Sequence, residues 1–175
     1  QYGYIPAPYS IYEKIFKLEP GKTLRLNCKT LDYKIQTYWS MTEVALNGEK
    51  NRFTGSEEEA ARELERLLKH AIRGQMIADV PLGAFLSGGI DSSLVVSLMQ
   101  AISPNKVKTF TIGFDVDKYN EARYAKEIAA HLGTEHTELY VTSQDAFTIM
   151  QHMPDSFTEP FADSSQIPTM LVSKM

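Results

Sequence analysis

The sequence predicts an α/β protein in which a parallel sheet carries helices on both faces, preceded by a short β-hairpin. From residue 56 on, segments typical of helices alternate with segments typical of strands, in the order α-β-α-β-α-β-α-α. The first of these strands leads through a glycine-containing turn into a buried helix. Two short strand-like segments near the N-terminus flank a turn and predict the hairpin.

The N-terminal part is predicted to be a linker that carries the hairpin. Leu24, Leu26 and Cys28 alternate with polar residues, which indicates a half-buried strand with Cys28 in the core, and residues 34–39 form the second strand. The spacing of apolar residues over 11–18 fits one or two helical turns. Residues 42–55 are polar and rich in turn formers, so a loop is expected there.

A long helix is predicted to begin after Ser56, because Glu59 follows three residues later and the pair forms a capping box. One helical face is apolar, and the opposite face mixes acidic and basic residues expected to pair with one another. The apolar face comprises Ala60, Leu64, Leu67, Leu68, Ala71 and Ile72.

The remaining elements follow from apolar runs and from glycine or proline breaks. Strands are predicted over 80–86, 107–114 and 136–141, and a buried helix covers 94–99. A further helix over 121–132 is expected to stop at Gly133, and residues 144–153 and 166–175 are predicted to be helical.

The segment Ser87–Ser93, with the sequence SGGIDSS, has the features of an anion site. It joins a predicted strand to a helix N-terminus, which presents free N–H groups and the positive end of the helix dipole. Gly88 and Gly89 allow a phosphate to approach the backbone, and the serines add hydroxyl donors. Asp91 would repel a polyphosphate, which predicts a bridging Mg²⁺. A tight turn capped by Ser and Asp, without any ligand, is the alternative.

In parallel sheets the ligand lies beyond the carboxyl ends of the strands, where strand order reverses. The Ser87–Ser93 loop follows the first predicted strand at that end. The backbone of Phe110–Gly113, at the end of the second strand, is therefore a candidate wall for adenine.

Composition narrows the function classes. A chain of 175 residues is roughly one domain, and its net charge of −4, without a basic stripe, argues against a nucleic-acid partner. The single cysteine excludes an internal disulfide and suits the cytoplasm. No apolar run approaches the ~20 residues of a membrane span. Because the chain begins with Gln1 and ends inside an apolar run, we expect a piece of a longer protein.

Seven segments together resemble one family, the glutamine-hydrolysing asparagine synthetases, over the first part of their synthetase domain. That domain is of the ATP pyrophosphatase type, with an adenine nucleotide alpha hydrolase-like fold. The matching segments are Ile15–Leu24, Tyr38–Trp39, Asp79–Gly83, Ser87–Ser93, Phe110–Phe114, His131–His136 and Glu159–Ser165.

The resemblance implies that ATP and aspartate form β-aspartyl-AMP and pyrophosphate, and that ammonia from glutamine then displaces AMP to give asparagine. It assigns the pyrophosphate and Mg²⁺ to the loop, the adenosine to two strand ends and the acceptor substrate to a later segment. The implied residues are Ser87, Gly88, Gly89, Asp91, Ser92 and Ser93 for pyrophosphate, with Asp91 as metal ligand and catalytic residue; Leu86, Ile112 and Gly113 for adenosine; and Asp163, Ser164 and Ser165 for the acceptor.

The resemblance also implies a domain plan: residues 1–55 would join a glutaminase domain absent here, and residues 56–175 would be the N-terminal part of the synthetase domain. No N-terminal cysteine nucleophile is present, and a second, acidic glycine-rich loop is expected beyond Met175. The isolated chain is therefore expected to bind nucleotide weakly and to be nearly inactive. The resemblance further implies a cytoplasmic homodimer for the full-length protein.

Two alternatives remain open. One is a related adenylating ligase, such as a β-lactam synthetase or another amidotransferase, which would use the same loop on a different carboxylate. The other is a nucleotide-binding module without turnover, although such a module has little need of Asp91.

Overall fold

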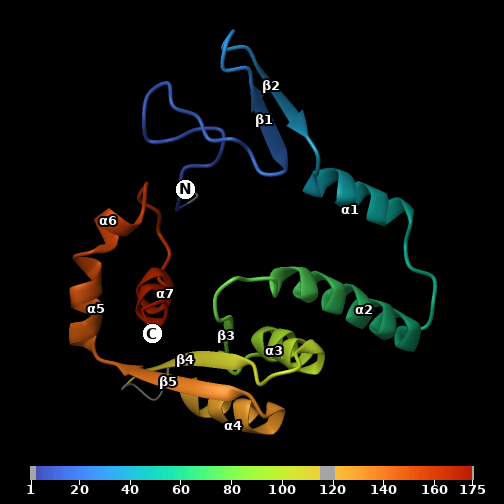
Figure 1. The fold of residues 1–175 in the computed structure, drawn as a ribbon, viewed down its shortest axis with the longest axis vertical. Coiled ribbons are helices and arrows are strands. Elements are labelled where there is room, and N and C mark those ends of the chain that lie inside the picture. The colour runs from blue at the N-terminus through green and yellow to red at the C-terminus, as the bar shows by residue number, and fades with distance from the viewer. Residues whose placement is uncertain (1–2, 115–120, 175) are drawn as a thin grey trace. The chain divides into compact units, whose positions relative to one another are not determined.

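A computed structural model describes residues 3–114 and 121–174 (Figure 1). The chain divides into two compact units. Unit 1 comprises Gln1–Thr54 with Pro154–Asp163, and unit 2 comprises Gly55–Met153 with Ser164–Met175.

Unit 1 contains the predicted hairpin, formed by β1 (Lys22–Leu26) and β2 (Tyr33–Thr37). The strands are antiparallel, and Lys22 pairs with Thr37 at one end of the ladder. The turn begins at Asn27, whose side-chain oxygen accepts a hydrogen bond from the Lys29 amide at 2.9 Å. Because β1 ends before this turn, Cys28 is exposed, and the prediction that Cys28 lies in the core is wrong.

Two other predictions for unit 1 are wrong. Residues 41–50, expected to be mostly loop, form helix α1 (Met41–Lys50), in which the Ser40 hydroxyl caps the helix by accepting from the Glu43 amide. Conversely, residues 11–14 form bends and a turn and residues 15–18 have no regular secondary structure, so the predicted helical turns are absent there. The Ser10 hydroxyl donates to the Ile15 carbonyl at 2.8 Å, and this bond closes a compact turn that competes with helix formation.

Unit 2 contains a parallel sheet of β3 (Gly83–Phe85), β4 (Lys108–Phe114) and β5 (Glu135–Val141), in the order β3-β4-β5. β3 is shorter than the predicted strand 80–86 and begins after Pro81, which has no N–H group to donate to a ladder. The Leu86 amide still donates to the Phe110 carbonyl at 2.9 Å. β3 therefore stops opposite Phe110, whereas β4 and β5 continue together to Phe114 and Val141.

Helices cover both faces of this sheet, as predicted (Figure 1). On one face, α4 (Ala122–Leu132) packs against β4, β5 and α3 (Ile90–Ile102), and on the other, α7 (Gln166–Val172) packs against β4. Buried residues between β3, α3 and α4 form the core, namely Leu86, Val96, Ala125 and Ala129. α4 ends at Gly133, in the left-handed conformation with φ +71°, as predicted.

The other helices of the described chain are α2 (Glu57–Gln75), α5 (Ser143–Met150) and α6 (Met153–Ser156). The predicted capping box of α2 is present, since the Ser56 amide donates to the Glu59 carboxylate at 2.8 Å and the Glu59 amide donates to the Ser56 hydroxyl. The apolar face of α2 is largely exposed, with Leu64 55% and Leu67 50% accessible.

Side chains as well as main-chain bonds join β4 to β5. The buried Thr109 hydroxyl lies 2.9 Å from His136 Nδ1 and 3.0 Å from the Thr134 hydroxyl. Two residues after His136 on β5, the Glu138 carboxylate accepts hydrogen bonds from Lys126 of α4 at 2.8 Å and from the Tyr140 hydroxyl at 2.9 Å. These bonds fix α4 and β5 at the edge of the sheet.

Candidate functional site

The Ser87–Ser93 loop lies between β3 and the first turn of α3, where the sequence predicts it. Gly88 has φ +81°, which side chains other than glycine rarely adopt. A Cβ atom at Gly88 would lie 2.8 Å from Tyr124 Cβ and 3.0 Å from the Ala125 amide nitrogen. The loop therefore runs directly against the first turns of α4, and only glycine fits at this contact.

The three loop hydroxyls are bonded within the loop. Ser87 Oγ lies 2.9 Å from Ser92 Oγ, and the Ser93 hydroxyl donates to the Gly89 carbonyl at 2.7 Å. The Ser92 hydroxyl contacts the same carbonyl at 3.2 Å. These hydrogen bonds between the loop's own groups hold the shape of the loop.

The main-chain amides of the loop are mostly without acceptors. Gly89, the N-cap of α3, provides no side-chain cap, and the amides of Gly88, Ile90, Asp91 and Ser92 have no acceptor within residues 3–114 and 121–174. Free amides at the positive end of a helix dipole favour an anion. The loop thus has the geometry of an anion site.

Asp91 is exposed in the first turn of α3 and forms no ion pair with the residues that the structure describes. No group of three or more His, Cys, Asp or Glu side chains that could hold a metal exists among those residues. A hard oxygen donor such as Asp91 suits Mg²⁺, which is commonly held by one or two carboxylates together with phosphate oxygens. Asp91 therefore fits a Mg²⁺ ion that arrives with a polyphosphate.

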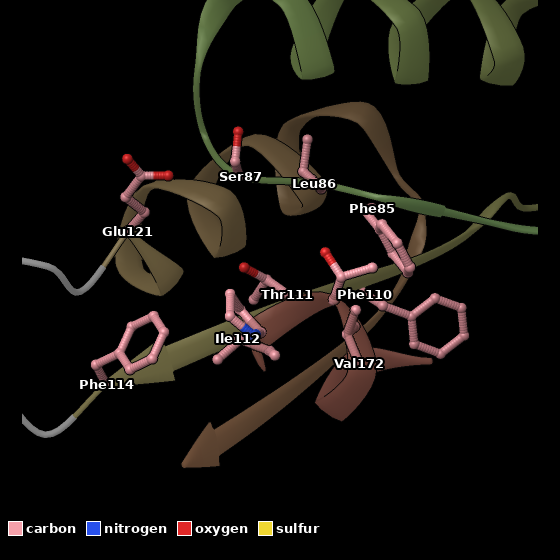
Figure 2. Close-up of a pocket in the computed structure, with 11 residues that line it drawn as sticks. Phe85, Leu86, Ser87, Phe110, Thr111, Ile112, Phe114, Glu121 and Val172 are labelled. Carbon is pink, nitrogen blue, oxygen red and sulfur yellow. The ribbon is translucent and has the colours of Figure 1, made fainter. Parts of the chain in front are cut away.

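A cavity of about 360 Å³ opens beside the loop (Figure 2). Its volume is within the range of small-molecule sites. β3, β4 and α7 contribute most of its wall, and the lining residues are Phe85, Leu86, Ser87, Phe110, Thr111, Ile112, Phe114, Glu121, Pro168, Thr169 and Val172. Figure 2 shows Ser87 and Glu121 at one end of the cavity and the rings of Phe85 and Phe110 at the other.

The structure brings only some of the predicted site residues to this cavity. Leu86, Ser87 and Ile112 line it, and the loop continues from Ser87 into α3. Gly113 instead faces α4, where a Cβ atom would lie 2.5 Å from the Tyr140 ring and 3.2 Å from Ala122 Cβ. A side chain at position 113 would therefore disturb the packed face of the sheet.

The residues predicted for the acceptor substrate lie before α7. Ser165 is the N-cap residue of α7, and its carbonyl accepts from the Thr169 amide at 3.0 Å. Ser164 belongs to unit 2, whereas Asp163 belongs to unit 1. None of the three lines the cavity.

Sequence reasoning missed the contribution of α7 and of Glu121 to the cavity. Pro168, Thr169 and Val172 come from a short helix whose position depends on packing against β4 and α5. Glu121 immediately precedes α4, and nothing in its local pattern distinguishes it from a solvent-exposed residue. No helix of the described chain is long and apolar enough to cross a membrane.

The fold and the loop define an α/β protein with a strand-to-helix turn that has the geometry of an anion site. The asparagine synthase family model matches residues 63–175. Over 174 residues the chain is 36% identical to a protein of Methanocaldococcus jannaschii that is provisionally named as a second glutamine-hydrolysing asparagine synthetase. It is 30% identical over 173 residues to glutamine-hydrolysing asparagine synthetase 1 of Bacillus subtilis. The chain belongs to the asparagine synthase family.

These matches include 99% of this chain but only 32% and 26% of the two relatives, so the chain spans about a third or less of their length. Among solved structures, the NMN synthetase of Francisella tularensis is similar with a TM-score of 0.39 and 22% identity. That similarity covers 61% of this chain and 42% of the other.

Proposed function

We propose that this chain is the ATP-binding part of an asparagine synthetase. The complete protein would transfer the adenylyl group of ATP to the side-chain carboxylate of aspartate, releasing pyrophosphate. Ammonia obtained from glutamine would then displace AMP and leave asparagine. Family membership supports this reaction class, and the Ser87–Ser93 loop beside the cavity is the structural observation that carries the proposal.

The loop suits the charge that develops in this reaction. Attack of the aspartate carboxylate on the α-phosphorus breaks the bond to the β-phosphate, so negative charge accumulates on the departing pyrophosphate. The free amides of Gly88, Ile90, Asp91 and Ser92 would donate to its oxygens. Because these donors are already oriented by α3 and by the serine hydrogen bonds, little reorganisation is needed during the step.

The cavity would accept the adenosine part of ATP. Its wall is formed largely by Phe85, Phe110, Ile112 and Val172, which suits an aromatic base. Leu86 directly follows β3 and Ile112 lies in the last half of β4, and both line the same cavity as Ser87 of the loop, so a base in the cavity and phosphates on the loop could belong to one molecule. Gly113 would contribute only indirectly, because it allows β4 to pack closely against Ala122 of α4 and the Tyr140 ring.

Asp91 would hold Mg²⁺ together with the phosphate oxygens. When bound, the ion would neutralise part of the charge on the polyphosphate. Asp91 itself is placed by the first turn of α3, where the helix dipole favours a carboxylate. Asp163, Ser164 and Ser165 remain proposed for the acceptor side, where the remaining parts of the complete protein would contribute.

The test measures the products formed from ATP by the full-length natural protein that contains this chain. With aspartate, glutamine and Mg²⁺, we expect AMP and pyrophosphate in amounts equal to asparagine. ADP and phosphate would contradict the proposal. AMP release that depends on another carboxylate would indicate a different adenylating ligase, and binding without any nucleotide consumption would indicate a binding module.

The matched variants are Asp91→Asn and Asp155→Asn. Asp155 is an exposed carboxylate on α6, outside the loop and the cavity. We expect at least about a hundredfold lower AMP release for Asp91→Asn, since a charge-stabilising group contributes on the order of 3 kcal/mol in such sites. Asp155→Asn should leave the rate unchanged.

A further inference from the structure

Gly83, the first residue of β3, lies where the sheet leaves no room for a side chain. A Cβ atom at this position would lie 2.4 Å from Phe110 Cε2, 3.1 Å from Phe110 Cδ2 and 3.3 Å from the Lys108 carbonyl oxygen. The backbone of Gly83 is that of a strand and lies outside the left-handed region, so its conformation does not require glycine. The requirement comes from the Phe110 ring, which fills the space of the missing side chain.

The register of the parallel ladder explains how the ring reaches Gly83. Phe85 pairs with Phe110, and Gly83 pairs with Lys108. Because side chains alternate between the two faces of a sheet, these four positions lie on one face. The Phe110 ring therefore extends diagonally from β4 onto β3, toward the amino-terminal end of β3.

This contact contributes to the cavity and not to the hydrophobic core. Gly83 is exposed and Phe110 is half-buried, whereas the core lies between β3, α3 and α4. The Phe110 ring lines the cavity of about 360 Å³, and Figure 2 shows it beside the Phe85 ring at one end of that cavity. Gly83 itself does not line the cavity. Any influence of Gly83 on a ligand there must therefore act through Phe110.

We propose that Gly83 is a positioning residue for the cavity, because it leaves the space in which the Phe110 ring forms an aromatic wall. A methyl group at position 83 would displace the ring, since the Lys108 carbonyl oxygen would have to shift only slightly while the ring atoms lie much closer. Side chains adopt a few staggered rotamers, so the ring would leave its place in the wall instead of adjusting gradually. This inference rests on the proposed function, because it takes the ligand of the cavity to be ATP.

The contact between Gly83 and Phe110 can be measured without any ligand or substitution. In nuclear Overhauser spectra of the 175-residue chain, the α-protons of Gly83 should give cross-peaks to the ring protons of Phe110. The absence of these cross-peaks would overturn the inference.

The effect on binding is tested by a double-mutant cycle, with dissociation constants of ATP in the presence of Mg²⁺ measured by amide chemical-shift titration. Gly83→Ala should weaken ATP binding about tenfold, or about 1.4 kcal/mol, as expected when a base loses its contact with an aromatic ring. Phe110→Val, whose side chain has no atoms at the δ and ε positions near Gly83, should weaken binding by a similar factor. Adding Gly83→Ala to Phe110→Val should then change the constant less than about twofold, because the two residues act as one unit.

The matched control is Gly74→Ala on α2, where no atom lies within 4 Å of an added Cβ. This variant should bind ATP as the unmodified chain does. Unchanged ATP binding in Gly83→Ala would overturn the inference, as would an equal further weakening when Gly83→Ala is added to Phe110→Val. Loss of the folded amide spectrum in Gly83→Ala that persists in the double variant would assign Gly83 to the fold and also overturn it.

The proposed function and this inference fail in different ways. If the unmodified chain shows the cross-peaks but does not bind ATP, the ATP-binding function fails and the inference falls with it. If ATP binds and shifts the amides of Gly88, Ile90 and Ser92, but Gly83→Ala leaves the affinity unchanged, only the inference fails.

Discussion

At Gly88 two independent constraints coincide. The backbone angle lies in the left-handed region, and the space where a Cβ atom would lie is filled by Tyr124 and Ala125. Gly133, at the end of α4, shares the positive φ but has no atom within 4 Å of a Cβ. Substitutions at Gly88 and Gly133 therefore separate two energetic costs, that of a side chain on a left-handed backbone and that of a steric clash.

We predict that Gly133→Ala lowers the free energy of unfolding by about 1–2 kcal/mol, the cost of a left-handed residue with a side chain. Gly88→Ala should lower it by a further ~1–3 kcal/mol, because the loop must also move away from α4. Urea unfolding followed by far-UV circular dichroism measures both values. Equal losses of unfolding free energy for the two variants would show that the close contact between the loop and α4 adds no energetic cost.

The proposed role of Asp91 as a Mg²⁺ ligand predicts that nucleotide binding depends on Mg²⁺ through this side chain. In the unmodified chain we expect Mg²⁺ to tighten ATP binding, because Asp91 and the phosphates would share the ion. In Asp91→Asn the affinity for ATP without Mg²⁺ should rise, since one repulsive charge is lost, and Mg²⁺ should no longer tighten binding. Calorimetric titration at several Mg²⁺ concentrations measures this. An unchanged Mg²⁺ dependence in Asp91→Asn would contradict the assignment.

At the scale of elements, the β4–β5 pair contains a group that links stability to pH. Burial lowers the pKa of His136; the Glu138 carboxylate opposes this effect, and Lys126 adds to it. The ring is held by Thr109, and its Nε2 atom is buried without a hydrogen-bond partner among described residues. Protonation would therefore place an unpaired charge against the packed sheet.

We predict that the protein loses stability as the pH falls below about 6.5, the pKa of an unperturbed histidine. Since the folded-state pKa of His136 is depressed, the unfolded chain binds the proton more readily, and folding weakens with acidification. Unfolding at pH 7 and pH 5 should show a smaller difference for His136→Gln than for the unmodified chain. His70→Gln, at an exposed position of α2, is the control.

At lower pH, a second group, Glu138, links the stability of the fold to pH. The ammonium of Lys126 and the hydroxyl of Tyr140 lower the pKa of Glu138, so its stabilising effect is present above about pH 4.3 and is lost as the pH falls through the lower folded-state value. The pH ranges in which His136 and Glu138 affect stability are separate. A loss of stability near pH 6 that persists in His136→Gln would therefore contradict the role of His136.

Local signals predicted those elements whose stabilising interactions lie within a few residues. The capping box of α2 and the glycine stop of α4 are examples, and so is the strand-turn-helix around Gly88. α1 was missed because its sequence contains Asn47 and Gly48, which disfavour helices, while its Ser40 cap is a single weak signal.

The site was only partly predictable for a related reason. A motif locates the loop, since amides and hydroxyls that act together are adjacent in sequence. The cavity wall instead combines Phe85, Phe110 and Val172 from three elements, and only the packing of α7 on β4 brings Val172 to the others. The sequence assigns Gly113 to adenosine because of its position in a strand. Which face of the sheet Gly113 lies on, however, is decided by its packing against α4.

At the scale of the whole chain, the division into two units predicts two unfolding events. Trp39, the single tryptophan, belongs to unit 1, whereas most of the helical residues belong to unit 2. We predict that tryptophan fluorescence and far-UV circular dichroism give different urea midpoints, because a two-state transition requires all probes to coincide.

A variant in one core provides the control. Ala129→Asp places a charge in the core of unit 2, where Ala129 is 1% accessible, and should lower the circular dichroism midpoint while the fluorescence midpoint stays in place. Coincident transitions in both forms would show that the units fold as one cooperative body.

β3 and β5 are the outer strands of the parallel sheet in unit 2, since β4 pairs with both. An outer strand leaves a row of main-chain groups ready to accept another strand. In a relative about three times as long, such as the one from Methanocaldococcus jannaschii, a strand added in parallel to β3 would terminate beside Ser87. The free edge of β3 therefore offers a later strand of a longer polypeptide a place next to the loop proposed to hold phosphates.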